Sequence, residues 1–184
     1  MGLHIKREKG FTLIELVVVI AIVSVLIVVL IAVVNPATQI KKGRDTQRRN
    51  TLKQLQQLLE QYYNDHGSYP STSSQFYASE TGEPAGIISN QTNDWIPGLA
   101  PTYIQSMPHD PVGGDTSSSN PACAGYKKSY LYKSDGAQYI LLASCSIEAA
   151  STSDSKDVFY DSTRQTGGGW VWKVCSGVTA CSSW

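Results

Sequence analysis

One apolar run near the N-terminus dominates the hydrophobic pattern of the chain. Between Leu16 and Val34 lie nineteen residues whose only polar member is Ser24. At about 1.5 Å per helical residue, such a run reaches across an apolar core of roughly 30 Å. Thirteen of the nineteen are Val or Ile, which favour strands, but a lipid-facing strand outside a barrel would leave its backbone unpaired. Because the run lacks barrel alternation, it predicts a membrane-spanning helix.

The next segment changes from uniformly apolar to amphipathic. Asn35-Pro36 predicts either a new helix with Asn35 as its cap or a kink within one long helix. Beyond it, apolar side chains recur at steps of three and four residues, which predicts a helix to about Asp65. Gly67 ends that pattern with a residue suited to a left-handed cap. The apolar stripe consists of Leu52, Leu55, Leu58, Leu59 and Tyr62.

The remainder of the chain has weaker periodicity. Ser71 to Val112 is rich in Ser, Thr, Asn, Gly and Pro, which predicts loops with short helices. Ser129 to Ser144 contains two runs rich in Tyr, Leu and Ile around Asp135-Gly136, which predicts a β-hairpin. Trp170 to Val174 is a candidate final strand. A helix followed by a β-rich segment indicates an α+β head.

Two features separate the apolar run from an ordinary membrane anchor. Glu15 lies within the longer stretch from Gly10 to Val34, directly before these nineteen residues, where a charge costs a few kcal/mol unless it is paired or close to an end. A carboxylate in the first turn of a helix is also favoured by the helix dipole, so an unpaired Glu15 near the headgroups is the simpler alternative. The leader MGLHIKREKG ends in Gly10 directly before Phe11. A secretory signal has its cleavage site after the apolar segment, so a cut at Gly10 would retain the helix.

The basic leader, Gly10 and the run FTLIELVVVIAIVSVL resemble the class III signal of type IV pilins and type II secretion pseudopilins. The resemblance implies that a prepilin peptidase cuts between Gly10 and Phe11 and that Phe11 is then N-methylated. It also implies that Glu15 pairs with the N-terminal amine of a neighbouring subunit. GRDTQRRNTLKQLQQLLEQYYNDHGSYP and MPHDPVGGD resemble later segments of the same proteins. The implied fold is α+β, a long N-terminal helix packed against a small antiparallel sheet. We therefore expect a leader (1–10), an assembly helix (11–34), an amphipathic helix (35–66) and a globular head (67–184).

Charge is unevenly distributed along the chain. Without the leader, 12 basic residues oppose 14 acidic ones, and from Gln54 onward the ratio is six to twelve. Before that point a basic cluster opposes only Asp45. It can contact lipid phosphates, DNA or acidic heads, or form a solvated surface, and nucleic acid is the weakest option because no Tyr or Trp interleaves. The cluster is Lys41, Lys42, Arg44, Arg48, Arg49 and Lys53.

The charges and the cysteines predict opposite orientations of the chain in the membrane. The positive-inside rule would place the head in the cytoplasm, because the basic cluster outweighs the leader. Four cysteines in the last 62 residues favour an oxidising compartment, so we expect the head outside. Four cysteines permit three pairings. The short separation favours Cys175 with Cys181, which leaves Cys123 with Cys145, although the sequence alone leaves the connectivity open.

No metal or cofactor is expected from these residues. His109-Asp110, between two prolines, is more typical of a turn than of a metal site. Some pseudopilins hold calcium in a loop after the sheet, which makes Asp154, Asp157 and Asp161 candidate ligands. Their spacing does not match an EF-hand.

The leading functional hypothesis is a structural subunit of a type IV pilus-like filament. Its implied partners are other copies of the chain, a prepilin peptidase, an inner-membrane assembly platform and, before assembly, membrane lipid. The alternatives are a major type II secretion pseudopilin and, in another class, an anchored adhesin that binds through Trp95, Trp170, Trp172 and Trp184. An enzyme is the least favoured class, since no nucleophile-base spacing or phosphate loop is present. We expect a single-pass inner-membrane precursor and an extracellular or periplasmic filament.

Overall fold

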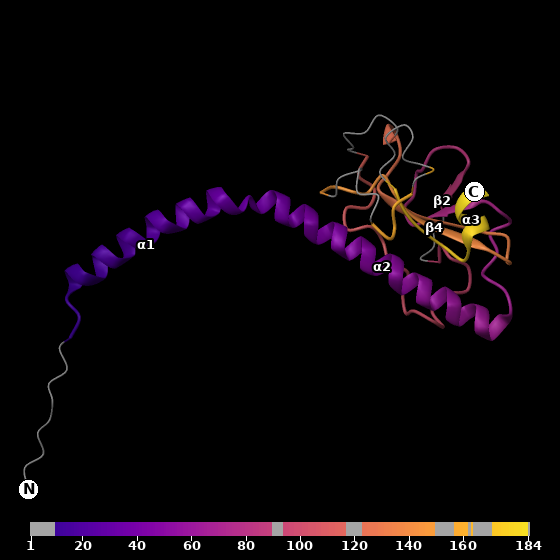
Figure 1. Cartoon of the computed structure of the whole chain (residues 1–184), viewed down its shortest axis with the longest axis horizontal. Coiled ribbons are helices and arrows are strands. Elements are labelled where there is room, and N and C mark those ends of the chain that lie inside the picture. Colours follow the sequence, from indigo (N-terminus) through magenta and orange to yellow (C-terminus); the bar gives the residue numbers. More distant parts are fainter. Residues whose placement is uncertain are drawn as a thin grey trace, which may run out of the picture. The chain divides into compact units, whose positions relative to one another are not determined.

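The computed structural model describes residues 10–89, 94–116, 123–149, 157–161, 163 and 171–183. Figure 1 shows the order of the elements along the chain. The chain divides into two units, Met1–Ile40 and Lys41–Trp184. The first unit carries the apolar helix and the second carries the head.

Helix α1 covers Leu13–Val34 and helix α2 covers Pro36–His66. Asn35 separates them in a left-handed conformation, with φ of 45° and ψ of 75°. Its carbonyl accepts hydrogen bonds from the backbone N–H groups of Thr38 and Gln39, at 3.0 and 3.4 Å. Pro36 then occupies the first position of α2, where its missing N–H costs nothing. Of the two expectations for Asn35-Pro36, the new helix is therefore correct.

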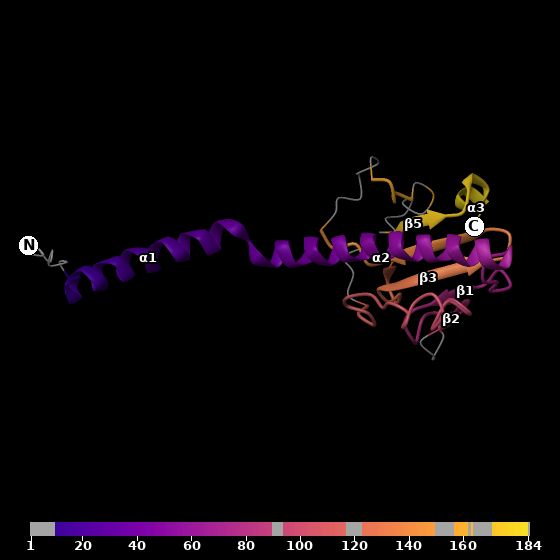
Figure 2. The same ribbon diagram turned by 90° about the horizontal axis from the view of Figure 1, so that it is seen from below.

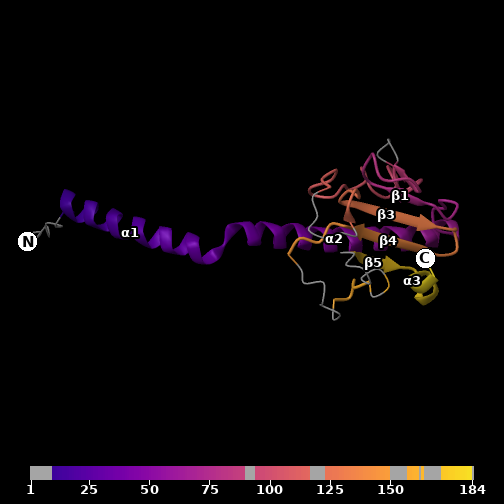
Figure 3. The ribbon, with the colours of Figure 1, turned by 90° about the horizontal axis from the view of Figure 1, so that it is seen from above.

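In the described part of the head, five strands form one sheet in the order β2-β1-β3-β4-β5. Their bounds are β1 Phe76–Ala78, β2 Ile87–Ser89, β3 Ser129–Ser134, β4 Tyr139–Ser144 and β5 Trp172–Cys175. Figures 2 and 3 show that α2 crosses one face of this sheet. A short helix, α3, covers Val178–Ser183 after β5.

The predicted hairpin is present as β3 and β4. The strands are antiparallel, with Ser129 opposite Ser144 and Ser134 opposite Tyr139. Gly136 has a φ of 94°, a backbone conformation that residues with a side chain rarely adopt. The Asp135 carboxylate accepts hydrogen bonds from the backbone N–H groups of Ala137 and Gln138, at 2.9 and 2.8 Å. An Asp side chain that binds the backbone ahead of it stabilises such a turn.

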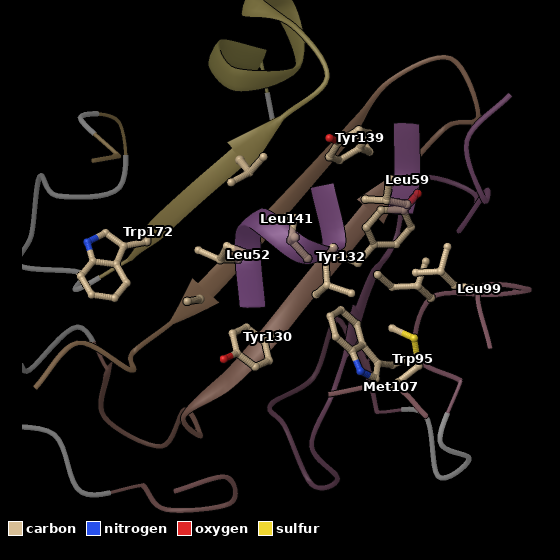
Figure 4. Packing of buried hydrophobic residues seen from close by; sticks show 14 of the residues in the cluster. Leu52, Leu59, Trp95, Leu99, Met107, Tyr130, Tyr132, Tyr139, Leu141 and Trp172 are labelled. Atoms are coloured by element: carbon tan, nitrogen blue, oxygen red, sulfur yellow. The ribbon is translucent and has the colours of Figure 1, made fainter. Parts of the chain in front are cut away.

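The alternation of the hairpin strands divides the buried residues between two faces. Tyr130, Tyr132, Tyr139 and Leu141 belong to the larger core, which α2 completes (Figure 4). The predicted apolar stripe of α2 packs against this core, since Leu52, Leu55 and Leu59 are all fully buried. A smaller cluster lies on the other face of the sheet, where the strand residues that alternate with those of the larger core point. It contains Ala78, Leu131, Ile140, Leu142 and Val171. A sheet buried on both faces explains why β4 is buried at every position.

The α+β class with a long N-terminal helix is confirmed, with corrections to the sheet. The sheet is mixed and not purely antiparallel, because β1 and β2 pair in parallel. Both strands lie in the stretch expected to be loop-dominated, and three residues are too few for an alternating pattern. The final strand, expected at Trp170 to Val174, covers Trp172–Cys175, and Trp170 lies outside the described residues. Helix α3 was not predicted, because six residues do not define a helical period.

Candidate functional site

The first candidate site is the apolar surface of α1. Leu13–Ile31 is long and apolar enough to cross a membrane, and none of it is buried within the protein. Phe11 and Leu13 are 83% and 81% exposed. An apolar surface of this extent is stable only when lipid or other protein covers it. The helix is therefore available for membrane anchoring and for contacts between subunits.

Glu15 lies in the first turn of this helix and forms a capping box with Thr12. The Glu15 carboxylate accepts hydrogen bonds from the Thr12 backbone N–H at 2.9 Å and the Thr12 hydroxyl at 2.7 Å. The Thr12 hydroxyl in turn accepts from the Glu15 N–H at 3.3 Å. The box satisfies donors that the helix start leaves open. Gly10 and Phe11 directly precede it, whereas leader residues 1–9 lie outside the described residues.

The second candidate site is the basic cluster, in which Lys41, Lys42 and Lys53 are exposed, as expected of a solvated surface, whereas the arginines form ion pairs with the head. Arg48 is completely buried. Its Nε and Nη2 donate to the two carboxylate oxygens of Asp110, at 2.7 and 2.8 Å. Its Nη1 donates to Asp45 at 2.9 Å. A two-pronged guanidinium–carboxylate contact is among the stronger polar contacts in proteins.

Glu148, after strand β4, extends this cluster. Its carboxylate contacts the Arg44 Nε at 2.5 Å and the Lys128 Nζ at 3.2 Å. The Asp45 carboxylate also accepts from the backbone N–H groups of Glu148 and Ala149, at distances between 2.7 and 3.2 Å. Two arginines of α2 are thus neutralised inside the head. A third, Arg49, contacts Asp157.

The electrostatics of Arg48 follow from these neighbours. Burial alone would lower the pKa of its guanidinium. The hydrogen bond to Asp110 and the negative charges of Asp110, Glu148 and Asp45 act in the opposite direction and raise that pKa overall. Arg48 therefore stays charged at any physiological pH, and the cluster acts as a permanent connection between α2 and the loops of the head.

Sequence reasoning missed Asp110 and Glu148 as partners of Arg48. Asp110 was considered only with His109, as a turn or a metal site. In the structure His109 is 45% exposed and its Nδ1 lies 3.0 Å from Glu80, while Asp110 is buried against Arg48. The local sequence around Asp110, between two prolines, does not indicate an ion pair with a residue as distant in the chain as Arg48.

The four cysteines form two disulfides, Cys123–Cys145 and Cys175–Cys181, each with a Cα–Cα distance of 5.6 Å. These are the pairings that the sequence favoured. The first connects the chain before β3 to the end of β4, and the second connects β5 to α3. Both close loops of the head.

Two of the four tryptophans considered for an adhesin lie within the described residues, and both are buried. Trp95 and Trp172 are 1% and 3% exposed and belong to the core (Figure 4). Trp170 and Trp184 lie outside the described residues, as does Asp154 of the proposed calcium ligands. The tryptophans that can be placed therefore support packing and not recognition.

The chain has a capped apolar helix that is not buried within the protein, followed by an amphipathic helix that packs on a small sheet. This arrangement defines the class of pilins and pseudopilins. Comparison with known proteins places the chain within that class. Residues 5–31 match the prokaryotic N-terminal methylation motif. Residues 35–139 match the type II secretion system (T2SS), protein G family, and the chain belongs to that family. It is therefore a structural subunit of the pilus and pseudopilus class, anchored in a membrane before assembly.

A curated relative gives the same result. The type II secretion system core protein G of Pectobacterium carotovorum subsp. carotovorum is 31% identical over 132 residues, which cover 71% of this chain and 78% of the relative. No solved structure matches the chain significantly. The family is one of structural subunits and not of enzymes.

Proposed function

We propose that the chain is a secretion pseudopilin that is cut between Gly10 and Phe11, N-methylated at Phe11 and assembled into a filament through α1. The observation that carries the proposal is the wholly exposed apolar span Leu13–Ile31 with Glu15 in its first turn. A plain anchor needs no carboxylate there. The family and the Pectobacterium relative favour a secretion pseudopilus over a surface pilus.

Assembly exchanges one apolar environment of α1 for another. Lipid surrounds the helix in the membrane, and neighbouring helices surround it in the filament, so packing and polar contacts decide the balance. Cleavage creates a free ammonium at Phe11. A neighbour's ammonium beside Glu15 neutralises a carboxylate that is costly in an apolar environment. Such a pair fixes the axial register between subunits.

The charges and the disulfides both bear on the orientation of the chain. The positive-inside rule counts charges close to a span, and the basic cluster outweighs the leader. Long segments and domains are translocated largely regardless of their charge, so the basic cluster does not by itself decide the side of the head. Two disulfides favour an oxidising compartment. The proposed location of the head is therefore outside the cytoplasm, and contact with nucleic acid is not part of the proposal.

The first experiment asks whether the chain is a filament subunit. Cells that express it are sheared, and the released filament fraction is analysed by intact mass. We expect a protein that lacks ten residues and carries one added methyl group at its new N-terminus. A full-length chain that stays in the membrane fraction would contradict the proposal and favour a tethered binding module.

The second experiment separates the two kinds of filament. Deletion of the gene is compared with wild type for release of folded secreted proteins and for surface pili. We expect a secretion defect with normal pili, restored by the wild-type gene. Normal secretion with loss of pili would instead identify a type IV pilus subunit.

A further inference from the structure

Residues 157–161 lie along the outer edge of strand β5. The backbone N–H of Lys173 donates to the carbonyl of Phe159 at 2.8 Å, and Tyr160 forms an antiparallel bridge with Trp172. This segment contains Asp157 and Asp161, which the sequence suggested as calcium ligands. Whether these two carboxylates fit a metal ion can be judged from the groups that already contact them.

Asp161 has its positive partner within the chain. It is fully buried, and its Oδ1 accepts from the Lys173 Nζ at 2.9 Å and from the Thr163 backbone N–H at 3.0 Å. The same ammonium donates to the carbonyl oxygen of Cys181 at 3.2 Å. The Lys173 side chain is only 13% exposed. A carboxylate and a carbonyl oxygen are ligands that a hard cation prefers, and here an ammonium contacts them.

Asp157 has a different positive partner, supplied by α2. Its Oδ2 accepts from the Arg49 Nη2 at 2.5 Å, and its Oδ1 accepts from the Phe159 backbone N–H at 3.0 Å. The Arg49 guanidinium also lies over the Trp172 ring, 4.4 Å from its centroid. The two carboxylates are therefore compensated separately, one by β5 and one by α2.

This arrangement does not fit calcium. Calcium binds six to eight oxygens at about 2.3–2.6 Å. An ion at that distance from the Asp161 Oδ1 would share the oxygen with the Lys173 ammonium, and like charges repel strongly where water is excluded. Within the described residues, no three His, Cys, Asp or Glu side chains gather as a possible metal site. Calcium would have to displace a buried lysine from its carboxylate.

We infer that this head uses two of its own cations, Lys173 and Arg49, where calcium is bound after the sheet in some pseudopilins. The Lys173 ammonium compensates the buried Asp161, and the Arg49 guanidinium connects Asp157 to α2. The segment along β5 is thereby held without an external ion. We therefore expect Asp157 and Asp161 to add no calcium dependence to the stability of the head, whether the filament serves secretion or forms a pilus.

The first test needs no substitution. The full chain in detergent is heated in excess calcium and in excess EGTA, and unfolding of the head is followed by tryptophan near-UV circular dichroism. We expect the same midpoint in both solutions. A higher midpoint in calcium, or saturable calcium binding by isothermal titration, would overturn the inference.

The second test examines the ammonium itself. Lys173→Met removes the ammonium that contacts the buried Asp161, so the midpoint should fall in both solutions, while Lys173→Arg should keep most of it. Lys41→Met is the matched control, because it removes the same charge from an exposed position. A Lys173→Met variant as stable as wild type would overturn the inference.

A double substitution separates loss of the ion pair from general damage at β5. Asp161→Asn in the Lys173→Met chain also removes the carboxylate charge that Lys173 contacts and keeps an oxygen for the Thr163 N–H. We therefore expect the double variant to unfold at a higher temperature than Lys173→Met alone. A further decrease would show that the two groups do not act as a pair and would contradict the inference.

Discussion

Arg48 and Asp110 form a fully buried two-pronged ion pair although 62 residues separate them in the chain. Arg48 belongs to α2, and Asp110 belongs to the long segment between β2 and β3. The pair therefore connects the helix to a segment that has little regular structure of its own. Removing either partner would leave a charge in a site from which water is excluded.

Arg48→Met should strongly destabilise the head. Breaking a buried ion pair by removing one partner typically costs about 3–5 kcal/mol, whereas replacing both partners with apolar residues costs much less. We expect Arg48→Met to lower the free energy of unfolding by about that amount and Arg48→Met with Asp110→Leu to recover part of it. Urea unfolding of the full chain in detergent measures both. Lys42→Met is the exposed control, and an equal effect there would refute the argument.

The contrast between this pair and the leucine stripe shows what the sequence could predict. Leu52, Leu55 and Leu59 were expected on one face because their spacing is local, and the structure buries all three. The β3–β4 hairpin was predictable for the same reason, since its alternation and its turn are adjacent. These elements determine where the core of the head lies.

Long-range ion pairs have no such local signal. Arg48 lies in a run of basic residues, and a charge run is normally a solvated surface. Besides the local Asp45, its partners Asp110 and Glu148 are 62 and 100 positions away, so only the fold shows that the charge is buried. Strands β1 and β2 were missed because three residues cannot show a period. By contrast, the features of α1 that matter for assembly are contiguous, and they could be recognised directly.

The two disulfides should differ in their contribution to stability. Cys123–Cys145 spans 22 positions and Cys175–Cys181 spans six. In the chain-entropy description, loops of these sizes give about 3.4 and about 2.2 kcal/mol. We expect replacement of Cys123 and Cys145 by Ser to lower the guanidinium midpoint more than replacement of Cys175 and Cys181. The reverse order would mean that native contacts, and not loop closure, dominate. Intact mass before and after reduction verifies the bonds that each variant retains.

The head should lose stability at alkaline pH because of its tyrosines. Burial, followed by the hydrogen bond to Glu60, raises the pKa of Tyr69 to about 12, and burial raises that of Tyr130 to about 12. Both values lie above the ordinary 10.0, so the folded state holds protons that the unfolded state releases. Their contribution is complete below about pH 10 and is lost as the pH rises through about 12. Tyrosinate absorbance and circular dichroism should therefore change together in that window.

Glu60 provides the matched test of the alkaline transition. Its carboxylate accepts from Tyr69 at 3.1 and 3.2 Å and from Tyr139 at 3.3 Å. Glu60→Gln removes the negative charge that opposes ionisation of these phenols, so the pKa of Tyr69 should fall and the loss of stability should become less steep. An unchanged transition would assign the effect to burial alone.

Gly10→Ala should block processing without disturbing the fold. A Cβ at Gly10 would meet no atom within 4 Å, so any effect reflects the peptidase and not the chain itself. We expect the uncleaved precursor to accumulate, visible as a slower band on a denaturing gel. Gly43→Ala is the matched control, because a Cβ there also meets nothing within 4 Å. Normal processing of Gly10→Ala would place the cut elsewhere.

Glu15 has two possible roles, as a helix cap and as a charge, and substitutions can separate them. Glu15→Ala removes both. Glu15→Gln keeps an oxygen for the Thr12 N–H and therefore keeps the capping box, but it has no charge to offer a neighbour's ammonium. If the charge fixes the register, both variants should be made and cleaved but poorly recovered in the sheared filament fraction. Glu15→Asp, with the charge on a shorter side chain, should retain part of the yield. The yield is measured as assembled protein relative to total mature protein. Wild-type yield from Glu15→Gln would mean that the cap, and not the charge, is what assembly requires.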